Sequence, residues 1–496
     1  MRDIEPIRAE LEKFIQEIEK EHYDNGAGLK EDLNTAAIYG KYNGIFSDET
    51  LVEEVKNRRV YHRGPDRMRM NYLYSMLASS YIGRELSPIT DRVSTLETRS
   101  EVDVDGKKVP FRYSAVALAN EPDHDKREAI DAARETVFNE VNPIRLEALN
   151  KSHELAVKLG YENYIQMCED MDGIDLYALR KQMQNVLERT DKLYSRYFKL
   201  ACSNVLKLAP ADVRKHDIGF FFRAKDFDRL FAQGNMLNAM NTTLDDIGLP
   251  LSGNPNIVLD IDAREKKSPR AFCSPINVPG KVMLCIMPKG GLDDYRAFFH
   301  EMGHSQHFGN VDAGNPFEFK YLGDSSVTEA YAFLFENLVS DKNWLRQAMG
   351  LSDEDAANVS QFLAFETLYM VRRYAAKLIY ELELHRDVEE PQKRYSAILE
   401  SALKFKHPEI HYLYDVDPGF YAASYLRAWM FEVQLRDVIS EQFGDLWWKE
   451  KGCGRFLKDM WSSGQKYMAD QHAKGLGYYG IDEFPLVKEI ERRLRY

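Results

Sequence analysis

The chain has 496 residues, 29% of them charged and 44% hydrophobic, and its 66 basic and 79 acidic side chains give a formal charge of −13 at pH 7. Nucleic-acid binding is disfavoured, because phosphate backbones are met by clustered Lys and Arg and no basic cluster here is long. No stretch approaches the roughly 18 uninterrupted apolar residues of a membrane helix, and residues 1–10 lack the apolar run of a signal peptide. We therefore expect a cytoplasmic globular protein without nucleic-acid or membrane partners, and the oligomeric state stays open.

Most of the chain is predicted to be helical, because apolar residues recur at intervals of three and four positions with few Pro or Gly interruptions. Strand signals are few and local, so the sequence favours a mainly α fold with one small β-sheet. The clearest helical segments are 4–20, 51–58, 126–160, 176–207, 352–386, 394–405 and 421–443.

Three segments carry strand signals. Residues 101–113 alternate apolar and polar side chains around Asp105-Gly106, a dipeptide that favours a hairpin turn. Residues 256–262 and 281–287 are short apolar runs, whereas 263–280 and 309–326 are predicted to be loops. The 281–287 strand has two interpretations: an edge strand that pairs with an extended peptide, or a strand of the core.

The segment His300-Glu301-Met302-Gly303-His304 is a His-Glu-x-x-His motif. Positions four apart on a helix differ by about 40°, so His300 and His304 would project from one face and share a zinc ion. Glu301 is offset by about 100° and would reach a zinc-bound water as a general base. The predicted helix begins near Asp293-Asp294 and ends near Gly309-Asn310.

Zinc in a catalytic site needs a third protein ligand and one open position. Glu329 lies 25 residues after His304, at the start of another helical run, and is the favoured third ligand. His307 competes, but three ligands from one straight helix would be spread over about 10 Å. Glu336 would orient a ligand from behind, or it is an ordinary surface glutamate.

Two phenols four residues apart, Tyr421 and Tyr425, follow His411 in the last third of the chain. Phenol and imidazole donors can stabilise the oxyanion of a tetrahedral intermediate. Taken alone, two tyrosines among 28 are more often plain core or surface aromatics.

The run from Phe298 to His307, followed by Thr328-Glu329-Ala330 and Glu336-Asn337, resembles the thimet oligopeptidase and oligoendopeptidase F family of zinc metallopeptidases. The resemblance is specific over residues 264–443 and only architectural before them. It implies an elongated helical body split by a deep substrate channel. Residues 1–200 would be a mostly helical part of the channel wall, with a soft boundary to a catalytic part at 201–496, in one integrated unit.

The resemblance also implies the chemistry. One zinc ion would be held by His300, His304 and Glu329, with Glu301 as general base, and His411, Tyr421 and Tyr425 would bind substrate. The expected activity is that of an oligoendopeptidase cleaving short unfolded peptides. Two alternatives stay open: a carboxypeptidase or dipeptidyl carboxypeptidase, with Arg427 or Lys404 holding the substrate carboxylate, and a non-catalytic peptide-binding protein.

Overall fold

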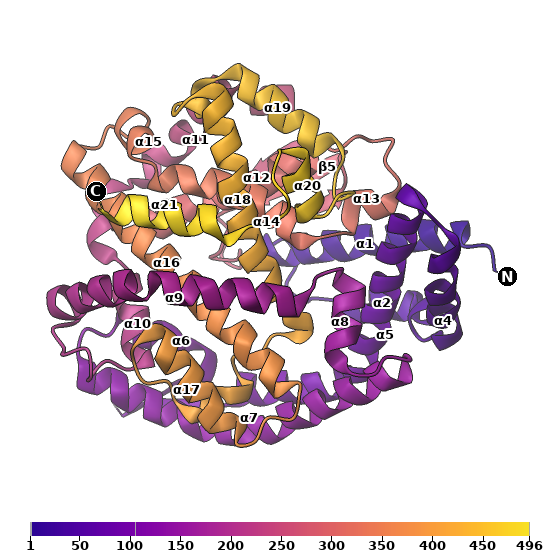
Figure 1. Ribbon diagram of the computed structural model, residues 1–496, viewed down its shortest axis with the longest axis horizontal. Coiled ribbons are helices and arrows are strands. Elements are labelled where there is room, and N and C mark those ends of the chain that lie inside the picture. Colours follow the sequence, from indigo (N-terminus) through magenta and orange to yellow (C-terminus); the bar gives the residue numbers. More distant parts are fainter. Residues whose placement is uncertain (1, 105, 496) are drawn as a thin grey trace.

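The computed structural model of the chain describes residues 2–104 and 106–495. Within them, helices predominate and strands form only two small sheets, which confirms the mainly α class (Figure 1). The helices are α1 (Glu5–Gly26), α2 (Thr35–Lys41), α3 (Asn43–Phe46), α4 (Glu49–Arg58), α5 (Gly64–Arg99), α6 (Phe111–Asn120), α7 (His124–Lys158), α8 (Tyr164–Asp172), α9 (Leu176–Ala201), α10 (Lys215–Phe222), α11 (Met236–Ile247), α12 (Leu292–Gly309), α13 (Phe317–Tyr321), α14 (Ser325–Glu336), α15 (Lys342–Gln347), α16 (Asp353–Leu384), α17 (Pro391–Leu403), α18 (Ala422–Phe443), α19 (Lys451–Ser462), α20 (Ala469–Gly475) and α21 (Glu483–Arg495). The strands are β1 (Glu101–Val104), β2 (Lys107–Pro110), β3 (Ile257–Asp260), β4 (Phe272–Asn277) and β5 (Lys281–Cys285).

All seven predicted helical segments are confirmed, as α1, α4, α7, α9, α16, α17 and α18. The predicted 176–207 helix ends as α9, and a short π-helical turn, Cys202–Leu206, completes it. The hairpin is confirmed as the antiparallel pair of β1 and β2, although helix α6 already begins at Phe111. Asp105, predicted in its turn, lies outside the described residues.

The three-stranded sheet has the order β3-β5-β4, so β5 is its central strand. The edge-strand interpretation of residues 281–287 is therefore wrong, and the core-strand interpretation is right. Side chains alternate between the faces: Met283 packs with α1 residues such as Tyr23, whereas Leu284 joins the main core. Helix α12 packs beside all three strands, which confirms a small sheet next to the predicted zinc helix.

The prediction of a loop at 263–280 is wrong where β4 lies. This strand pairs with β5 but shows a register shift between Ser274 and Asn277, next to Pro275. Proline has no amide hydrogen and is tolerated on edge strands and at bulges, so it hides such a strand from a search for continuous strand signals. In the loop predicted at 309–326, the short helix α13 forms and α14 begins.

The main hydrophobic core draws residues from nearly the whole chain, from Ile4 in front of α1 to Leu494 in α21. Figure 1 shows α9 crossing the molecule below α21, and α9 packs against both α16 and α21. Helix α14 packs against α12 on one side and α18 on the other. The boundary near residue 200 and the deep channel stay predictions.

None of the helices in the described residues is both long enough and apolar enough to cross a membrane.

Candidate metal centre

Helix α12 presents the His-Glu-x-x-His motif and has the predicted bounds. Asp293 and Asp294 lie in its first turn, and the helix ends at Gly309 with Asn310 as its C-cap. The carboxylate of Asp294 accepts the backbone N–H of Gly290 at 2.8 Å and so holds the preceding loop. Phe298, Phe299 and Met302 are fully buried and fix the opposite face of the helix in the core.

Helix α14 supplies Glu329, and its start is firmly anchored. The N-cap Asp324 accepts the backbone N–H of Ser326 at 2.9 Å and forms an ion pair with Arg427 of α18 at 3.1 Å. Arg427 is buried and also pairs with Asp470 at 2.8 Å. These contacts fix where the third predicted ligand lies.

The close approach of α14 to α12 depends on a glycine inside the motif. A Cβ atom on Gly303 would lie 2.6 Å from the carbonyl oxygen of Tyr331 and 2.6 Å from Cα of Ala332. Side-chain atoms do not approach backbone this closely, so only glycine permits this helix crossing. The crossing brings Glu329 to the two histidines.

The ligand atoms of His300, His304 and Glu329 lie within 4.8 Å of one another. Glu329 Oε2 is 3.4 Å from His300 Nε2 and 3.8 Å from His304 Nε2. Ligands about 2.0–2.1 Å from a tetrahedral zinc ion are roughly 3.4 Å apart, so the spacing fits one ion. Glu329 Oε2 is buried and has no hydrogen-bond partner among the described residues, the condition expected of an atom meant for a metal.

Both histidines are oriented from behind. His300 Nδ1 lies 2.9 Å from Glu336 Oε2, and His304 Nδ1 lies 2.8 Å from Thr328 Oγ1. Glu336 is itself held by Arg296, whose Nη2 donates to its other oxygen at 2.8 Å. With Nδ1–H donated to these acceptors, the Nε2 lone pairs are left to face Glu329.

The cluster is electrostatically coupled. Burial lowers the pKa of His300, but the neighbouring carboxylates of Glu329 and Glu336 outweigh it and raise the pKa to about 10. Burial lowers the pKa of His304 to about 4. A metal ion binding to His300 would therefore displace a proton, because only neutral imidazole is a ligand.

Glu301 follows His300 on α12 and contacts the edge strand β4. Its Oε2 accepts the backbone N–H of Cys273 at 2.9 Å. Burial raises the pKa of Glu301 to about 7, although His300 opposes the shift. A carboxylate with a pKa near neutrality suits a group that must both accept and return a proton.

The residues predicted to bind substrate fall into two places. Tyr421 is 44% exposed, its ring is 5.3 Å from that of Tyr425, and the charge of Glu329 acts on both phenols. His411 is buried elsewhere: its Nδ1 lies 3.1 Å from Lys215 Nζ and its ring packs on Phe138. Both tyrosines therefore lie near the group of His300, His304 and Glu329. None of the described contacts of His411 is with a residue of this group.

His307, the competing ligand, is fully buried and stacks on Phe308 at 5.0 Å. Burial lowers its pKa to about 3. It lies outside the three-residue group, as expected for a histidine that fills the core.

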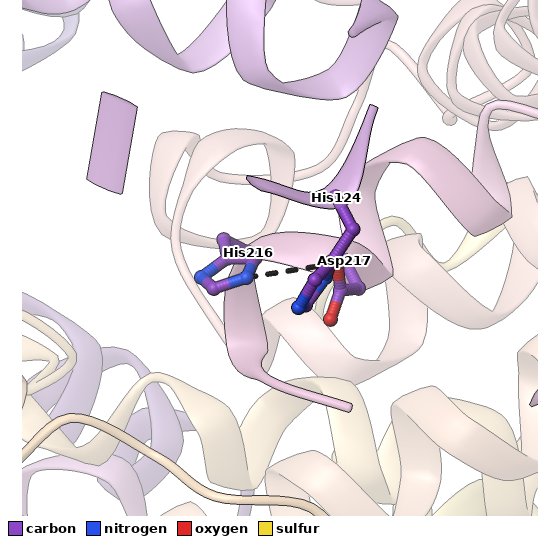
Figure 2. Close-up of side chains that lie close together, drawn as sticks. All are labelled: His124, His216 and Asp217. Carbon is purple, nitrogen blue, oxygen red and sulfur yellow. Dashed lines mark hydrogen bonds and ion pairs between the residues drawn. The ribbon is translucent and has the colours of Figure 1, made fainter. Parts of the chain in front are cut away.

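A second group with similar composition lies at the start of α7 and in α10. Figure 2 shows His124, His216 and Asp217 close together, with ligand atoms again within 4.8 Å. Asp217 Oδ1 already accepts Nε of the buried Arg127 at 2.9 Å, and Oδ2 accepts the backbone N–H of Arg214 at 2.8 Å. A metal ion here would meet the guanidinium charge and an occupied carboxylate, so the group does not fit one. A third group, with His124, Asp125 and Glu128, is largely exposed.

Sequence reasoning missed Gly303, Arg296 and the hydrogen bond of Thr328. A glycine inside a helical pattern is a signal of close packing and would have pointed to Gly303. Arg296 lies four residues before His300, one helical turn away, but nothing local in the sequence shows that it holds Glu336.

The comparisons with known proteins bear on the fold. No protein-family model and no curated protein matches the chain. Among solved structures, the chain is similar to a crystal structure from Bacillus anthracis str. Ames described as a "putative oligoendopeptidase F". The match has a TM-score of 0.62 and 13% sequence identity, and it covers 100% of this chain and 96% of that chain. The chain therefore has the fold of that protein over its full length.

Proposed function

We propose that this chain is a zinc-dependent oligoendopeptidase that hydrolyses peptide bonds in short unfolded peptides. The observation that carries the proposal is the group of His300, His304 and Glu329. In this group a buried carboxylate oxygen, which has no hydrogen-bond partner within residues 2–104 and 106–495, faces two Nε2 atoms. The position of Glu301 beside this group and the fold shared with a protein described as an oligoendopeptidase support it.

When bound, zinc would polarise the scissile carbonyl and lower the pKa of a water molecule towards neutrality. His300, His304 and Glu329 would hold the ion, and Glu336 and Thr328 keep the two imidazoles in place. Glu301 takes a proton from the attacking water on a carboxylate oxygen and then passes it to the amine of the departing peptide. The N–H of Cys273 holds the Glu301 carboxylate in position.

Oxyanion stabilisation is assigned to Tyr421 and Tyr425, because their rings pack together and the charge of Glu329 acts on both phenols. Each donor of this kind contributes roughly 2–4 kcal/mol to transition-state stabilisation. His411 has no described contact that supports this role, and its participation stays a prediction.

Endopeptidase action is favoured over carboxypeptidase action, because the two cations considered for binding the substrate carboxylate, Arg427 and Lys404, are already paired with carboxylates of the protein. Arg427 is occupied by Asp324 and Asp470, and Lys404 Nζ lies 2.6 Å from Asp191. A carboxylate-binding cation should be free to meet the ligand. Neither side chain is.

The test is cleavage of a mixed library of short peptides, each made with free and amidated C-termini. We expect zinc-dependent cleavage at internal bonds, unaffected by amidation, and abolished by Glu301→Gln with zinc content retained. A matched control is Glu10→Gln on the exposed surface of α1, which should cleave like the native chain. Undiminished cleavage in Glu301→Gln contradicts the proposed base, and loss of cleavage on amidation favours the carboxypeptidase.

A further inference from the structure

A pocket of about 200 Å³ adjoins the candidate metal centre. It lies between α12, α14, α16, α18 and α21. Its wall includes Glu336, the acceptor behind His300, and Tyr425, one of the two phenols beside Glu329. Phe333, also in the wall, has its ring 5.3 Å from the ring of His300. A peptide held at the centre would therefore have one side chain next to this pocket.

Aromatic rings form one part of the pocket wall. The Trp429 ring is 5.4 Å from that of Phe333 and 5.5 Å from that of Tyr374, and Tyr374 is 5.6 Å from Tyr425. Such rings pack well against the long methylene stems of Lys and Arg, and their faces attract the cationic groups.

The carboxylate of Glu366 forms another part of the pocket wall. Glu366 Oε2 accepts Nη1 of Arg296 at 2.7 Å, and Arg296 also pairs with Glu336, so two carboxylates share one guanidinium. Glu366 Oε1 has no hydrogen-bond partner among the described residues, and the side chain is 16% exposed. Burial raises the pKa of Glu366, although Arg296 opposes the shift.

The remaining charged groups of the wall are paired with one another. Arg436 contacts Glu432 at 2.7 Å and Glu489 at 2.9 Å, and Arg493 contacts Glu489 at 2.7 Å. Glu336 and Glu366 have only Arg296 between them, and Glu336 also contacts His300 through its second oxygen, so the carboxylate oxygen left for a ligand is Glu366 Oε1.

We propose that this pocket receives a lysine or arginine side chain of the substrate, with the stem against Tyr374, Tyr425 and Trp429 and the cationic group on Glu366 Oε1. This inference rests on the proposed peptidase function and adds to it a preference for basic peptides.

The test uses pairs of quenched fluorescent peptides that differ only by Lys or norleucine, which has the same methylene stem without the charge. Lys is placed in turn at each of the four positions around the scissile bond. At one position we expect the native chain to prefer Lys by about tenfold or more in kcat/KM, as for a hydrogen bond between charged groups. Glu366→Gln should abolish most of this preference, and Glu366→Lys should reverse it in favour of a Glu-containing peptide.

The matched control is Glu354→Gln, an exposed glutamate on the same helix α16, which should keep the preference of the native chain. Equal cleavage of Lys and norleucine peptides at every position, or an unchanged ratio in Glu366→Gln, overturns the pocket assignment while leaving the peptidase in place. A preference for Phe over Lys at the responsive position also overturns it. If the native chain cleaves none of the peptides, the proposed function fails and the pocket assignment fails with it.

Discussion

Two groups in this molecule combine two histidines and one carboxylate with ligand atoms within 4.8 Å of one another, and they differ in the hydrogen bonds of the carboxylate. In the group on α12 and α14, Glu329 Oε2 is buried without a hydrogen-bond partner in the described chain. In the group on α7 and α10, Asp217 accepts hydrogen bonds from Arg127 and from the backbone of Arg214. Proximity alone therefore does not mark a metal site. Our proposal of a zinc site on α12 and α14 rests instead on the missing partner of Glu329 Oε2 and on the acceptors that orient the two imidazoles.

The largest expected effect on stability comes from a substitution of Asp217 in the α7–α10 group. Asp217→Asn would leave the buried Arg127 without its ion pair, which should lower the free energy of unfolding by roughly 3–5 kcal/mol. Zinc content should not change. Urea denaturation and metal analysis of the purified variant check both statements, and loss of zinc from it would show that the α7–α10 group holds the ion.

A second prediction concerns the helix crossing that assembles the α12–α14 group. Gly303→Ala places a methyl group against the backbone of α14, and overpacking of this kind costs about 1–3 kcal/mol of stability. Glu329 should also move away from the histidines and weaken zinc binding. Gly83→Ala is the matched control, because a Cβ on this exposed glycine of α5 meets nothing within 4 Å. Equal zinc affinity in the two variants would contradict the role of the crossing.

The residues behind the histidines should separate the groups further. Glu336→Gln should weaken zinc binding by about 10–100-fold, the usual effect of losing the acceptor behind a ligand. In the other group, Asp131 Oδ2 lies 3.5 Å from His216 Nδ1, and Asp131→Asn should leave zinc affinity unchanged. Competition with a fluorescent zinc chelator measures both. Similar losses of zinc affinity in Glu336→Gln and Asp131→Asn would contradict the assignment of zinc to the α12–α14 group alone.

A buried histidine outside both groups, His385, whose Nδ1 lies 2.8 Å from His153 Nε2, should affect how stability depends on pH. Burial lowers the pKa of His385 to about 3, below the value near 6.5 expected in the unfolded chain. Its contribution to stability is therefore complete above pH 6.5 and falls by about 1.4 kcal/mol for each pH unit below it. Urea denaturation at pH 7.5 and 5.5 should show a smaller difference for His385→Gln than for the native chain. An unchanged difference would mean that His385 binds a proton without cost in the folded state.

The sequence was most informative where the chemistry depends on spacing along one helix. Residues four apart on α12 share a face whatever surrounds them, so the pairing of His300 and His304 needed no tertiary information. Glu329 could be placed because a helical run begins just before it. The seven helices were predicted for the same reason, since their apolar period is local.

Tertiary contacts explain what could not be predicted. The strand β4 was hidden by Pro275, which an edge strand tolerates, and the central place of β5 depends on that strand. The sequence separates His411 from Tyr421 by only ten residues, but His411 lies on a short 3-10 helix, Glu409–Leu413, and contacts Lys215 and Phe138 instead of the metal group. Arg296 and Glu366 pair across helices far apart in the chain, which no local pattern reports.

The most direct test of the α12–α14 site is the stoichiometry and affinity of zinc binding, measured by equilibrium dialysis of the native chain, Glu329→Gln and Asp217→Asn. We expect one ion per chain in the native protein and in Asp217→Asn, and a loss of affinity greater than about 100-fold in Glu329→Gln, because a ligand should matter more than the acceptor behind one. Full zinc affinity in Glu329→Gln, or two ions per native chain with one lost in Asp217→Asn, would contradict the assignment.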